Sequence, residues 1–403
     1  MFKSLSLKVI LFGFIFTFFS SFGQSYFIGL FNPSIRADLS ITHGQFGTIY
    51  ASATLLSSFI LIWLGKKIDD MNALKFSIFV IILLSFACYF FSTIKTISFL
   101  FAGIFFLRLS GQGLMSHTAT TTVTRFFEKT RGKALSITWL GLSAAEFILP
   151  ILIVFLLIFI SWRNIWFYIS LFVLILLPII SFSLIKKIKT DSREISKPIK
   201  EKANSDVKQW KRVETLKDYR FYIISLNLLS MPSIATGVFI YQSYILTSKN
   251  WGPFIMAQSF MVYSILTVIT LSISGFLIDR YTSRKLLIFM NIPLFMSSVV
   301  LYVFDSPFSS FVFMGLIGVT NGFANVLGSS IWAEIYGVKY IGGIKALTSG
   351  LMVFATATGT AVFGILIDKG YSINSIAIFS AIYIAIIVLL LFFFRKKIEP
   401  TYI

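Results

Sequence analysis

Two charged residues, Arg108 and Glu146, lie inside long apolar stretches of this sequence. A charge in hydrocarbon is unfavourable and usually marks a functional site. The planar guanidinium of Arg offers a fork of donors that fits a carboxylate, and a buried Glu can carry a proton. The pair therefore predicts recognition of an organic anion coupled to proton movement. The alternative is a permanent ion pair that fixes helix packing and meets no substrate.

Helical spacing extends the polar surface around Arg108. Gln112, Ser116 and Thr120 follow it at steps of four residues, which places all four side chains on one face of a helix. His117 lies nine residues from Arg108 and points to the opposite face. We expect this polar stripe to face a cavity, with Gln112 beside Arg108 as a substrate contact.

The sequence contains no constellation that an enzyme would need. The two histidines, His43 and His117, are far apart and lack ligand spacing, and the single cysteine, Cys88, lies in an apolar stretch. No nucleophile–base set, nucleotide loop or metal cluster is present. We expect no enzymatic activity, no metal and no cofactor.

The composition places these residues in a membrane protein. Of 403 residues 57% are hydrophobic and 13% charged, and the mean hydropathy is +0.87. The apolar residues form blocks of about 18–25, the length a helix needs to cross a bilayer. The first block resembles a secretory signal because Lys3 and Lys8 precede it, but its length favours a retained span. Helices are expected at 8–31, 43–64, 72–93, 97–124, 133–160, 164–186, 219–247, 252–277, 284–304, 308–333, 342–367 and 373–394.

The distribution of basic residues tests this topology. With both termini in the cytoplasm, 29 of the 35 Lys and Arg residues fall on the cytoplasmic side, five fall outside and Arg108 remains in the membrane. The net charge of +19 is then a topology signal and a contact with anionic lipid, so no nucleic-acid partner is expected. We predict a multi-pass protein of the plasma (inner) membrane.

One long polar stretch divides the chain into two halves. Residues 187–218 mix both charge signs with few large apolar residues, so they cannot form a core. We expect six helices in 1–186, a cytoplasmic linker at 187–218 with a short amphipathic helix near Trp210, and six helices in 219–403. The fold is thus all-α, with twelve transmembrane helices in two bundles.

The two halves repeat each other. After the second span the chain reads Gly65-Lys-Lys-Ile-Asp69, and after the eighth it reads Gly275-Phe-Leu-Ile-Asp279, at an offset of 210. Entering the fifth and eleventh spans, Lys133-Ala-Leu and Lys345-Ala-Leu recur at an offset of 212. Equivalent loops at nearly one offset indicate an internal repeat.

These loops resemble the signature of the major facilitator superfamily, a Gly and an acidic residue followed by basic residues. The second copy follows the pattern closely, whereas the first has Asp70 where the family usually has Arg. The resemblance implies two pseudo-symmetric six-helix bundles that alternate between inward- and outward-open states. It also implies a conformational gating role for Gly65, Asp69, Gly275, Asp279, Arg280 and Arg284.

The same resemblance implies that the first, seventh and tenth helices line the cavity. On these helices the polar candidates for substrate binding are Gln24, Asn227, Tyr241, Asn321 and Asn325. The amides at 321 and 325 are one helical turn apart, and they can bond either a substrate or a neighbouring helix.

Residues 21–33 and 125–134 are most similar to the monocarboxylate and oxalate/formate porter branch of that family. No Lys or Arg lies deep in the second half, which favours a singly charged anion. We therefore expect a monomeric symporter or exchanger for a small monocarboxylate-like anion, with Glu146 coupling proton movement. The alternatives are a proton-antiport exporter of drugs or amphipathic metabolites and a non-transporting membrane sensor on the same fold.

Overall fold

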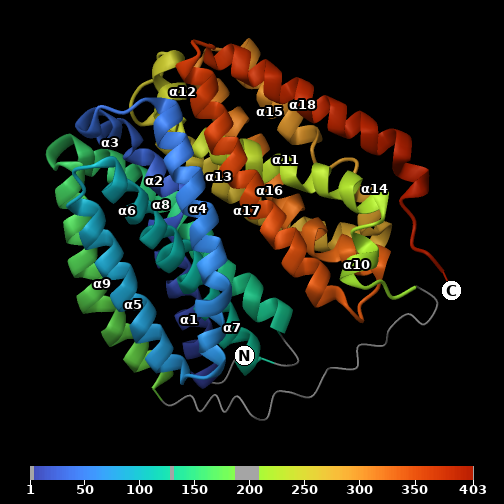
Figure 1. Cartoon of the computed structure of the whole chain (residues 1–403), viewed down its shortest axis with the longest axis horizontal. Coiled ribbons are helices and arrows are strands. Elements are labelled where there is room, and N and C mark those ends of the chain that lie inside the picture. The colour runs from blue at the N-terminus through green and yellow to red at the C-terminus, as the bar shows by residue number, and fades with distance from the viewer. Residues whose placement is uncertain (1–3, 128–130, 187–207, 403) are drawn as a thin grey trace. The chain divides into compact units, whose positions relative to one another are not determined.

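The computed structural model describes residues 4–127, 131–186 and 208–402, except for the side chains of Asp69, Arg131 and Ser329. Its elements are helices, and they form two compact units (Figure 1). Unit 1 comprises residues 1–197 with 239–243, and unit 2 comprises 198–238 with 244–403. Most of the predicted linker, 187–207, lies outside the described residues.

Unit 1 contains six spans, and the first and fourth of them are interrupted. The first consists of α1 (Ser4–Phe19), a 3-10 turn (Ser20–Gly23), α2 (Ser25–Leu30) and α3 (Asn32–Leu39). The fourth consists of α6 (Ile97–Leu107), a π-helical segment (Arg108–Met115) and α7 (Ser116–Phe126). The others are α4 (His43–Lys66), α5 (Ala73–Ser92), α8 (Arg131–Phe159) and α9 (Trp162–Ile185).

Unit 2 begins with the one-turn helix α10 (Arg212–Thr215) of the predicted linker. Its spans are α11 (Tyr219–Ile240), α13 (Ile255–Tyr281), α16 (Pro307–Tyr336), α17 (Ile341–Asp368) and α18 (Ile373–Phe394). The short helix α12 (Gln242–Ser248) follows α11. Between α13 and α16 the chain forms α14 (Ser283–Leu286), a turn and α15 (Ile292–Val303).

The all-helical membrane fold predicted from the sequence is confirmed, with one correction. Eleven helices of the described chain are long and apolar enough to cross a bilayer. The ninth predicted span, 284–304, is not one helix, because the chain leaves helical geometry between Leu286 and Ile292. Only α15, with 12 residues, remains of it as a regular apolar helix. Pro293 lies in the first turn of α15, where its missing N–H is not needed.

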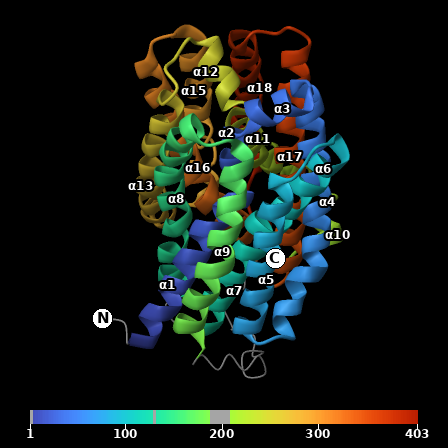
Figure 2. The same cartoon turned by 90° about the vertical axis from the view of Figure 1, so that its left-hand side faces the viewer.

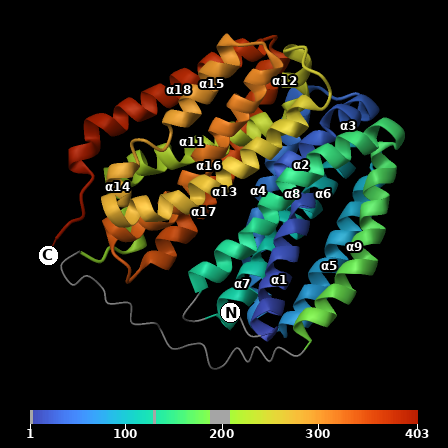
Figure 3. The same cartoon turned by 180° about the vertical axis from the view of Figure 1, so that it is seen from behind.

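The two units pair their spans in the same way. In unit 1, α1 packs on α8, α4 on α6, and α5 on α9, which lie side by side in Figure 2. In unit 2, α13 packs on α16 and α15 on α18, the equivalent pairs (Figure 3). Close crossings occur at glycines: a Cβ on Gly141 would lie 2.0 Å from the Phe14 carbonyl oxygen, and a Cβ on Gly359 would lie 2.0 Å from the Ser233 carbonyl oxygen. The predicted repeat is thus visible in the packing.

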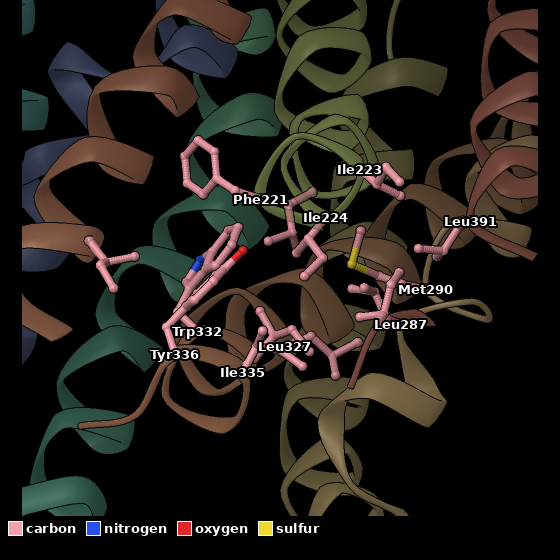
Figure 4. Close-up of a cluster of buried hydrophobic side chains, with 14 residues drawn as sticks. Phe221, Ile223, Ile224, Leu287, Met290, Leu327, Trp332, Ile335, Tyr336 and Leu391 are labelled. Atoms are coloured by element: carbon pink, nitrogen blue, oxygen red, sulfur yellow. The ribbon is translucent and has the colours of Figure 1, made fainter. Parts of the chain in front are cut away.

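A buried apolar cluster holds together the end of unit 2 at which α11 begins. Phe221 of α11 packs on Trp332 of α16 with ring centroids 5.4 Å apart, and Trp332 is stacked with Tyr336 (Figure 4). Leu391 of α18 and Ile398, beyond that helix, complete the cluster. Ile344 of α17 also belongs to the cluster, which therefore joins α11, α16 and α17, the three helices that line the pocket described below.

Candidate functional site

The first span breaks where it crosses the π-helical segment of the fourth. Gln24 has an extended backbone (φ −83°, ψ 151°), so the helix cannot run through it. A Cβ on Gly23 would lie 2.3 Å from the Leu107 carbonyl oxygen, and a Cβ on Gly111 would lie 2.6 Å from the Gly23 nitrogen. Only two glycines allow the backbones to approach this closely. π-Helical turns of this kind often lie at functional sites.

Arg108 lies at this crossing and is 2% exposed. Its Nη1 donates to the carbonyl oxygen of Gly23 at 3.0 Å and to the hydroxyl of Ser25 at 3.4 Å. The guanidinium carbon lies 5.3 Å from the ring centre of Tyr50 in α4, whose hydroxyl is 2.8 Å from that of Ser25. The Nε of Arg108 has no hydrogen-bond partner among the described residues. One side of the guanidinium is therefore anchored, and a donor on the other edge is unused.

Glu146 lies in α8, which packs on α1 and α2 of the first span. It is 7% exposed, and the hydroxyl of Tyr26 in α2 lies within electrostatic range of its carboxyl group. α8 carries it there by packing closely on α1 through Gly141 (Figure 3). Within the described part of the chain, Glu146 makes neither an ion pair nor a hydrogen bond.

Arg108 and Glu146 therefore do not form the permanent ion pair that the sequence allowed. Arg108 contacts Ser25, and Glu146 is close to the next residue, Tyr26, which points in a different direction from the helix axis. The two charges thus have different neighbours in the broken first span. This geometry removes the reading in which the charges merely neutralise each other.

Gln24 and Gln112 accompany Arg108 at the crossing. Both are partly exposed, and the backbone nitrogen of Gln112 lies beside Gly23. Further along the predicted stripe, the hydroxyl of Thr120 donates to the carbonyl oxygen of Ser116, so it stabilises its own helix. The structure brings together Arg108, Gln24 and Gln112 but leaves Thr120 to a local role.

Unit 2 has a pocket of its own, with a volume of about 120 Å³. Asn321 donates to the hydroxyl of Tyr263 at 2.9 Å, and Asn325 lies 3.4 Å from the Asn321 side-chain oxygen. The lining side chains carry no charge, and apolar surface predominates. They are contributed by α11, α16 and α17, and include Ser225, Met231, Asn321, Asn325, Trp332 and Thr348.

Two other predicted substrate contacts lie elsewhere. Asn227 is fully buried and donates to the carbonyl oxygen of Leu287, while Asn291 donates to its side-chain and backbone oxygens at 3.0 and 2.7 Å. The Asn227 amide therefore satisfies a carbonyl in the turn that replaces the ninth span. Tyr241, in the segment 239–243 of unit 1, donates from its hydroxyl to the carbonyl oxygen of His43.

The signature loops differ between the units. In unit 1 the carbonyl oxygen of Gly65 lies 3.0 Å from Nε2 of His117, and the side chain of Asp69 lies outside the described part of the chain. In unit 2, Gly275 has open space around it and Asp279 is exposed.

The two arginines of the second loop contact groups other than Asp279. Arg280 lies over the ring of Tyr281. Arg284 lies 3.5 Å from a carboxylate oxygen of Glu334 and 3.1 Å from one of Glu399. In this structure the ion pairs of the second loop therefore run through Arg284, which Glu334 holds at the end of α16.

Sequence reasoning missed Gly23, Gly111, Ser25 and Tyr50. The glycines carried a signal, because an isolated Gly in a helical pattern often marks a close backbone approach. Ser25 and Tyr50 carried none, since one hydroxyl residue in a helix is usually unremarkable. Only the crossing of three spans shows that these side chains hold Arg108.

The fold and its glycine-mediated crossings agree with the comparison to known families. The family model of the Major Facilitator Superfamily matches residues 13–307 and, in a second match, residues 222–402. The chain belongs to the major facilitator superfamily. Like other members, this chain is a multi-pass membrane transporter and not an enzyme. No curated protein matches the chain at a significant level.

Among solved structures, this superfamily member is similar to a bacterial homologue of the human lysosomal transporter Spinster, solved inward-facing and occupied. The two share 13% identity at a TM-score of 0.73, over 99% of this chain and 98% of that one. The nucleoside transporter NupG gives a TM-score of 0.73 at 15% identity, over 99% and 100% of the two chains. At such identities the likeness establishes the fold alone. The substrate of this chain has to be inferred from its own residues.

Proposed function

We propose that this chain is a secondary transporter that moves a small organic, monocarboxylate-like anion by alternating access, coupled to protons. The observation that carries the proposal is the anchored guanidinium of Arg108 with its unused Nε. A buried guanidinium donor without an acceptor is unfavourable. A substrate carboxylate would supply the missing acceptor in the bidentate geometry that suits Arg.

Glu146 supports the proton-coupling part of the proposal. A carboxyl group that is 7% exposed and makes no ion pair within the described residues is stabilised when it holds a proton. Binding an anion near the first span would change the charge around Glu146 and so its proton occupancy. Gln24 and Gln112 are proposed as further substrate contacts, because they are partly exposed at the crossing.

The remaining proposals concern topology and gating. The excess of Lys and Arg in alternate loops supports a plasma-membrane protein with both termini in the cytoplasm, and we propose that it acts as a monomer. The loops around Gly65, Asp69, Gly275, Asp279, Arg280 and Arg284 are proposed to change partners between conformations.

Ligand-dependent thermal stabilisation tests the anion site without an assumption about direction. A ligand that binds only the folded carrier raises its unfolding temperature. We would screen the detergent-solubilised protein with short monocarboxylates and the matching neutral amides. Carboxylates should stabilise the protein, and Arg108→Gln should remove the shift.

Two controls make this result specific. Lys95→Gln removes an exposed cation and should leave the shift unchanged. Arg108→Lys keeps the charge but lacks the fork, so it should retain only part of the shift. Equal stabilisation by carboxylates and amides in the parent protein would overturn the proposal.

A second candidate is export of amphipathic compounds by proton antiport. The neutral, mostly apolar pocket of unit 2 favours it, because Trp332 and the paired amides suit an uncharged ligand. Specificity would then depend on three side chains that line the pocket, those of Met231, Asn321 and Asn325. Stabilisation by neutral aromatic compounds that survives in Arg108→Gln and is lost in Asn325→Ala would favour this candidate.

A further inference from the structure

The end of unit 2 where α11 begins holds a segment that folds back after α18. Residues Ile398–Tyr402, here called the strap, lie along the end of the linker. The backbone nitrogen of Lys208 donates to the carbonyl oxygen of Thr401 at 2.7 Å. The linker is in turn fixed to α16, because the nitrogen of Trp210 donates to the carbonyl oxygen of Tyr336 at 3.0 Å. Backbone pairing of this kind is one way in which proteins bind extended peptides.

Two arginines hold the strap from the other side. Arg220, only 9% exposed, donates to the carbonyl oxygen of Glu399 and to the hydroxyl of Thr401 at 3.1 Å. Its Nε also bonds the carboxylate of Asp218 at 2.7 Å, which fixes the direction of the fork. Arg284 reaches the Glu399 carboxylate at 3.1 Å. We call the surface formed by Lys208, Trp210, Arg220 and Arg284 the groove. Its two arginines also pair with Asp218 and Glu334 of unit 2.

The groove also has an aromatic wall and an apolar floor. The ring of Trp210 lies 4.2 Å from the Lys208 ammonium and 5.3 Å from the Arg220 guanidinium, so it shields both cations. Ile398 is 3% exposed and belongs to the buried cluster of Figure 4. The groove thus binds two features of the strap, the apolar side chain of Ile398 and the acidic side chain of Glu399 that follows it.

The strength of these contacts is uneven. Without the strap, the nitrogen of Lys208 and two donors of Arg220 lose their acceptors in the protein, so another acceptor has to replace them. The Glu399 carboxylate, however, is 60% exposed, and an ion pair of that kind contributes little. Contacts of this strength allow the strap to open locally without unfolding of the helices.

We propose that this groove is a docking site for an acidic extended peptide, that the strap is its resident occupant, and that release of the strap frees the linker at Lys208, while Gln209 and Trp210 stay bonded to Lys339 and Tyr336. The site is separate from Arg108 and from the unit 2 pocket. It gives the linker two states, docked and free, whatever the substrate is.

Cysteine accessibility tests the docking in the full chain. In a Cys88→Ser background, Ile398→Cys should react slowly with a water-soluble maleimide, whereas Tyr402→Cys, at a position 62% exposed, should react fast. Adding Glu399→Gln should speed labelling at position 398 about two- to fivefold, the range that loss of an exposed ion pair allows. Glu399→Lys should speed it further by repulsion from Arg284.

A charge control completes this test. In an Arg284→Gln background, which also removes the pair with Glu334, Glu399→Gln should add no further increase, because the pair between 284 and 399 is already broken. Arg280→Gln, which removes a neighbouring cation that lies over Tyr281, should have no effect. Equal labelling at 398 and 402 in the parent, or no response to Glu399→Lys, would overturn the proposal.

Trypsin provides a reporter that leaves Ile398 in place. Cleavage after Lys208 should be slow in the parent and faster in Glu399→Lys, since its backbone nitrogen is bonded to the strap. Cleavage after the exposed Lys211 and Arg212 is the internal reference. If the strap variants left cleavage after Lys208 unchanged relative to these two sites, the link between strap and linker would be refuted.

Discussion

Each unit contains a broken span whose freed carbonyl is bonded by a side chain from a neighbouring span, but the donors differ. In unit 2 the carbonyl of Leu287 receives the neutral amide of Asn227. In unit 1 the carbonyl of Gly23 receives the guanidinium of Arg108. A neutral amide is thus enough to support such a break. Supporting the broken span in unit 1 does not require a buried positive charge. This is the main reason to assign Arg108 a second role.

The hydrogen-bonding groups around the two donors, Asn227 and Arg108, also differ. Asn291 donates to the backbone and side-chain oxygens of Asn227, and its own side-chain oxygen is a buried acceptor without a partner among the described residues. Arg108 has an unused Nε and the partly exposed Gln112 one turn away. Both breaks therefore retain an unused polar atom, but in unit 2 it is a neutral acceptor and in unit 1 it is a donor on a cation, which suits an anionic ligand.

Breaking the crossing in unit 1 should have the largest effect. Gly23→Ala places a Cβ 2.3 Å from a backbone oxygen and 2.4 Å from a backbone nitrogen, neither of which can move like a flexible side chain. We expect a loss of at least about 3 kcal/mol or failure to fold. Thermal unfolding in detergent checks this. Gly275→Ala, which has open space around it, is the control and should be neutral or slightly stabilising.

Replacing the two donors sharpens the comparison directly. Asn227→Leu and Arg108→Leu each leave a buried carbonyl without its donor, which should lower stability by about 1–3 kcal/mol. Only Arg108→Leu should abolish binding and transport of the carboxylates that stabilise the parent. Equal loss of transport per folded molecule in both variants would show that Arg108 acts through packing alone.

Glu146→Gln should separate stability from coupling. The amide has nearly the same size and removes a buried ionisable group, so we expect a change in stability of less than about 1 kcal/mol or a small gain. Uptake driven by a pH gradient should be lost, while exchange of substrate for substrate should persist. Unchanged dependence on the pH gradient in this variant would exclude Glu146 as the proton carrier.

The smallest effect is expected at Asn325. Its contact with Asn321 is long, 3.4 Å, and the side chain is exposed. Asn325→Ala should change stability by less than about 0.5 kcal/mol. Carboxylate binding should remain, and only ligands that fit the unit 2 pocket should bind more weakly, as isothermal titration would show. A loss as large as that of Asn227→Leu would mean that Asn325 supports the fold.

The class of fold was predictable from sequence because it rests on summed properties. Apolar block length and the alternation of basic loops defined the spans, and the recurrence of Gly65 and Asp69 at 275 and 279 indicated the repeat. The broken ninth span was not predicted, because the turn residues 287–291 are as apolar as a helix would be. Pro293 was a local signal of a break that the length of the apolar block did not reveal. The amide of Asn227, which bonds the carbonyl oxygen of Leu287 inside the turn, is a tertiary contact that no local pattern reveals.

Of the candidate site, only the two charged residues could be predicted from the sequence. Arg108 and Glu146 stand out because a charge in an apolar block is unfavourable wherever the block lies. Their separation depends on how the first span passes between the fourth and fifth, which helical spacing within one span cannot show. Asn227 and Asn325 look alike in sequence, yet one is buried in a helix contact and the other lines a pocket.

The most direct test of the account is uptake of a carboxylate that stabilises the purified protein into liposomes with and without a pH gradient, in the parent and in Arg108→Lys and Asn227→Leu. We predict gradient-dependent uptake in the parent, a severe loss in Arg108→Lys, and retained uptake per folded molecule in Asn227→Leu. Full uptake in Arg108→Lys, or uptake indifferent to the gradient in the parent, would contradict the account.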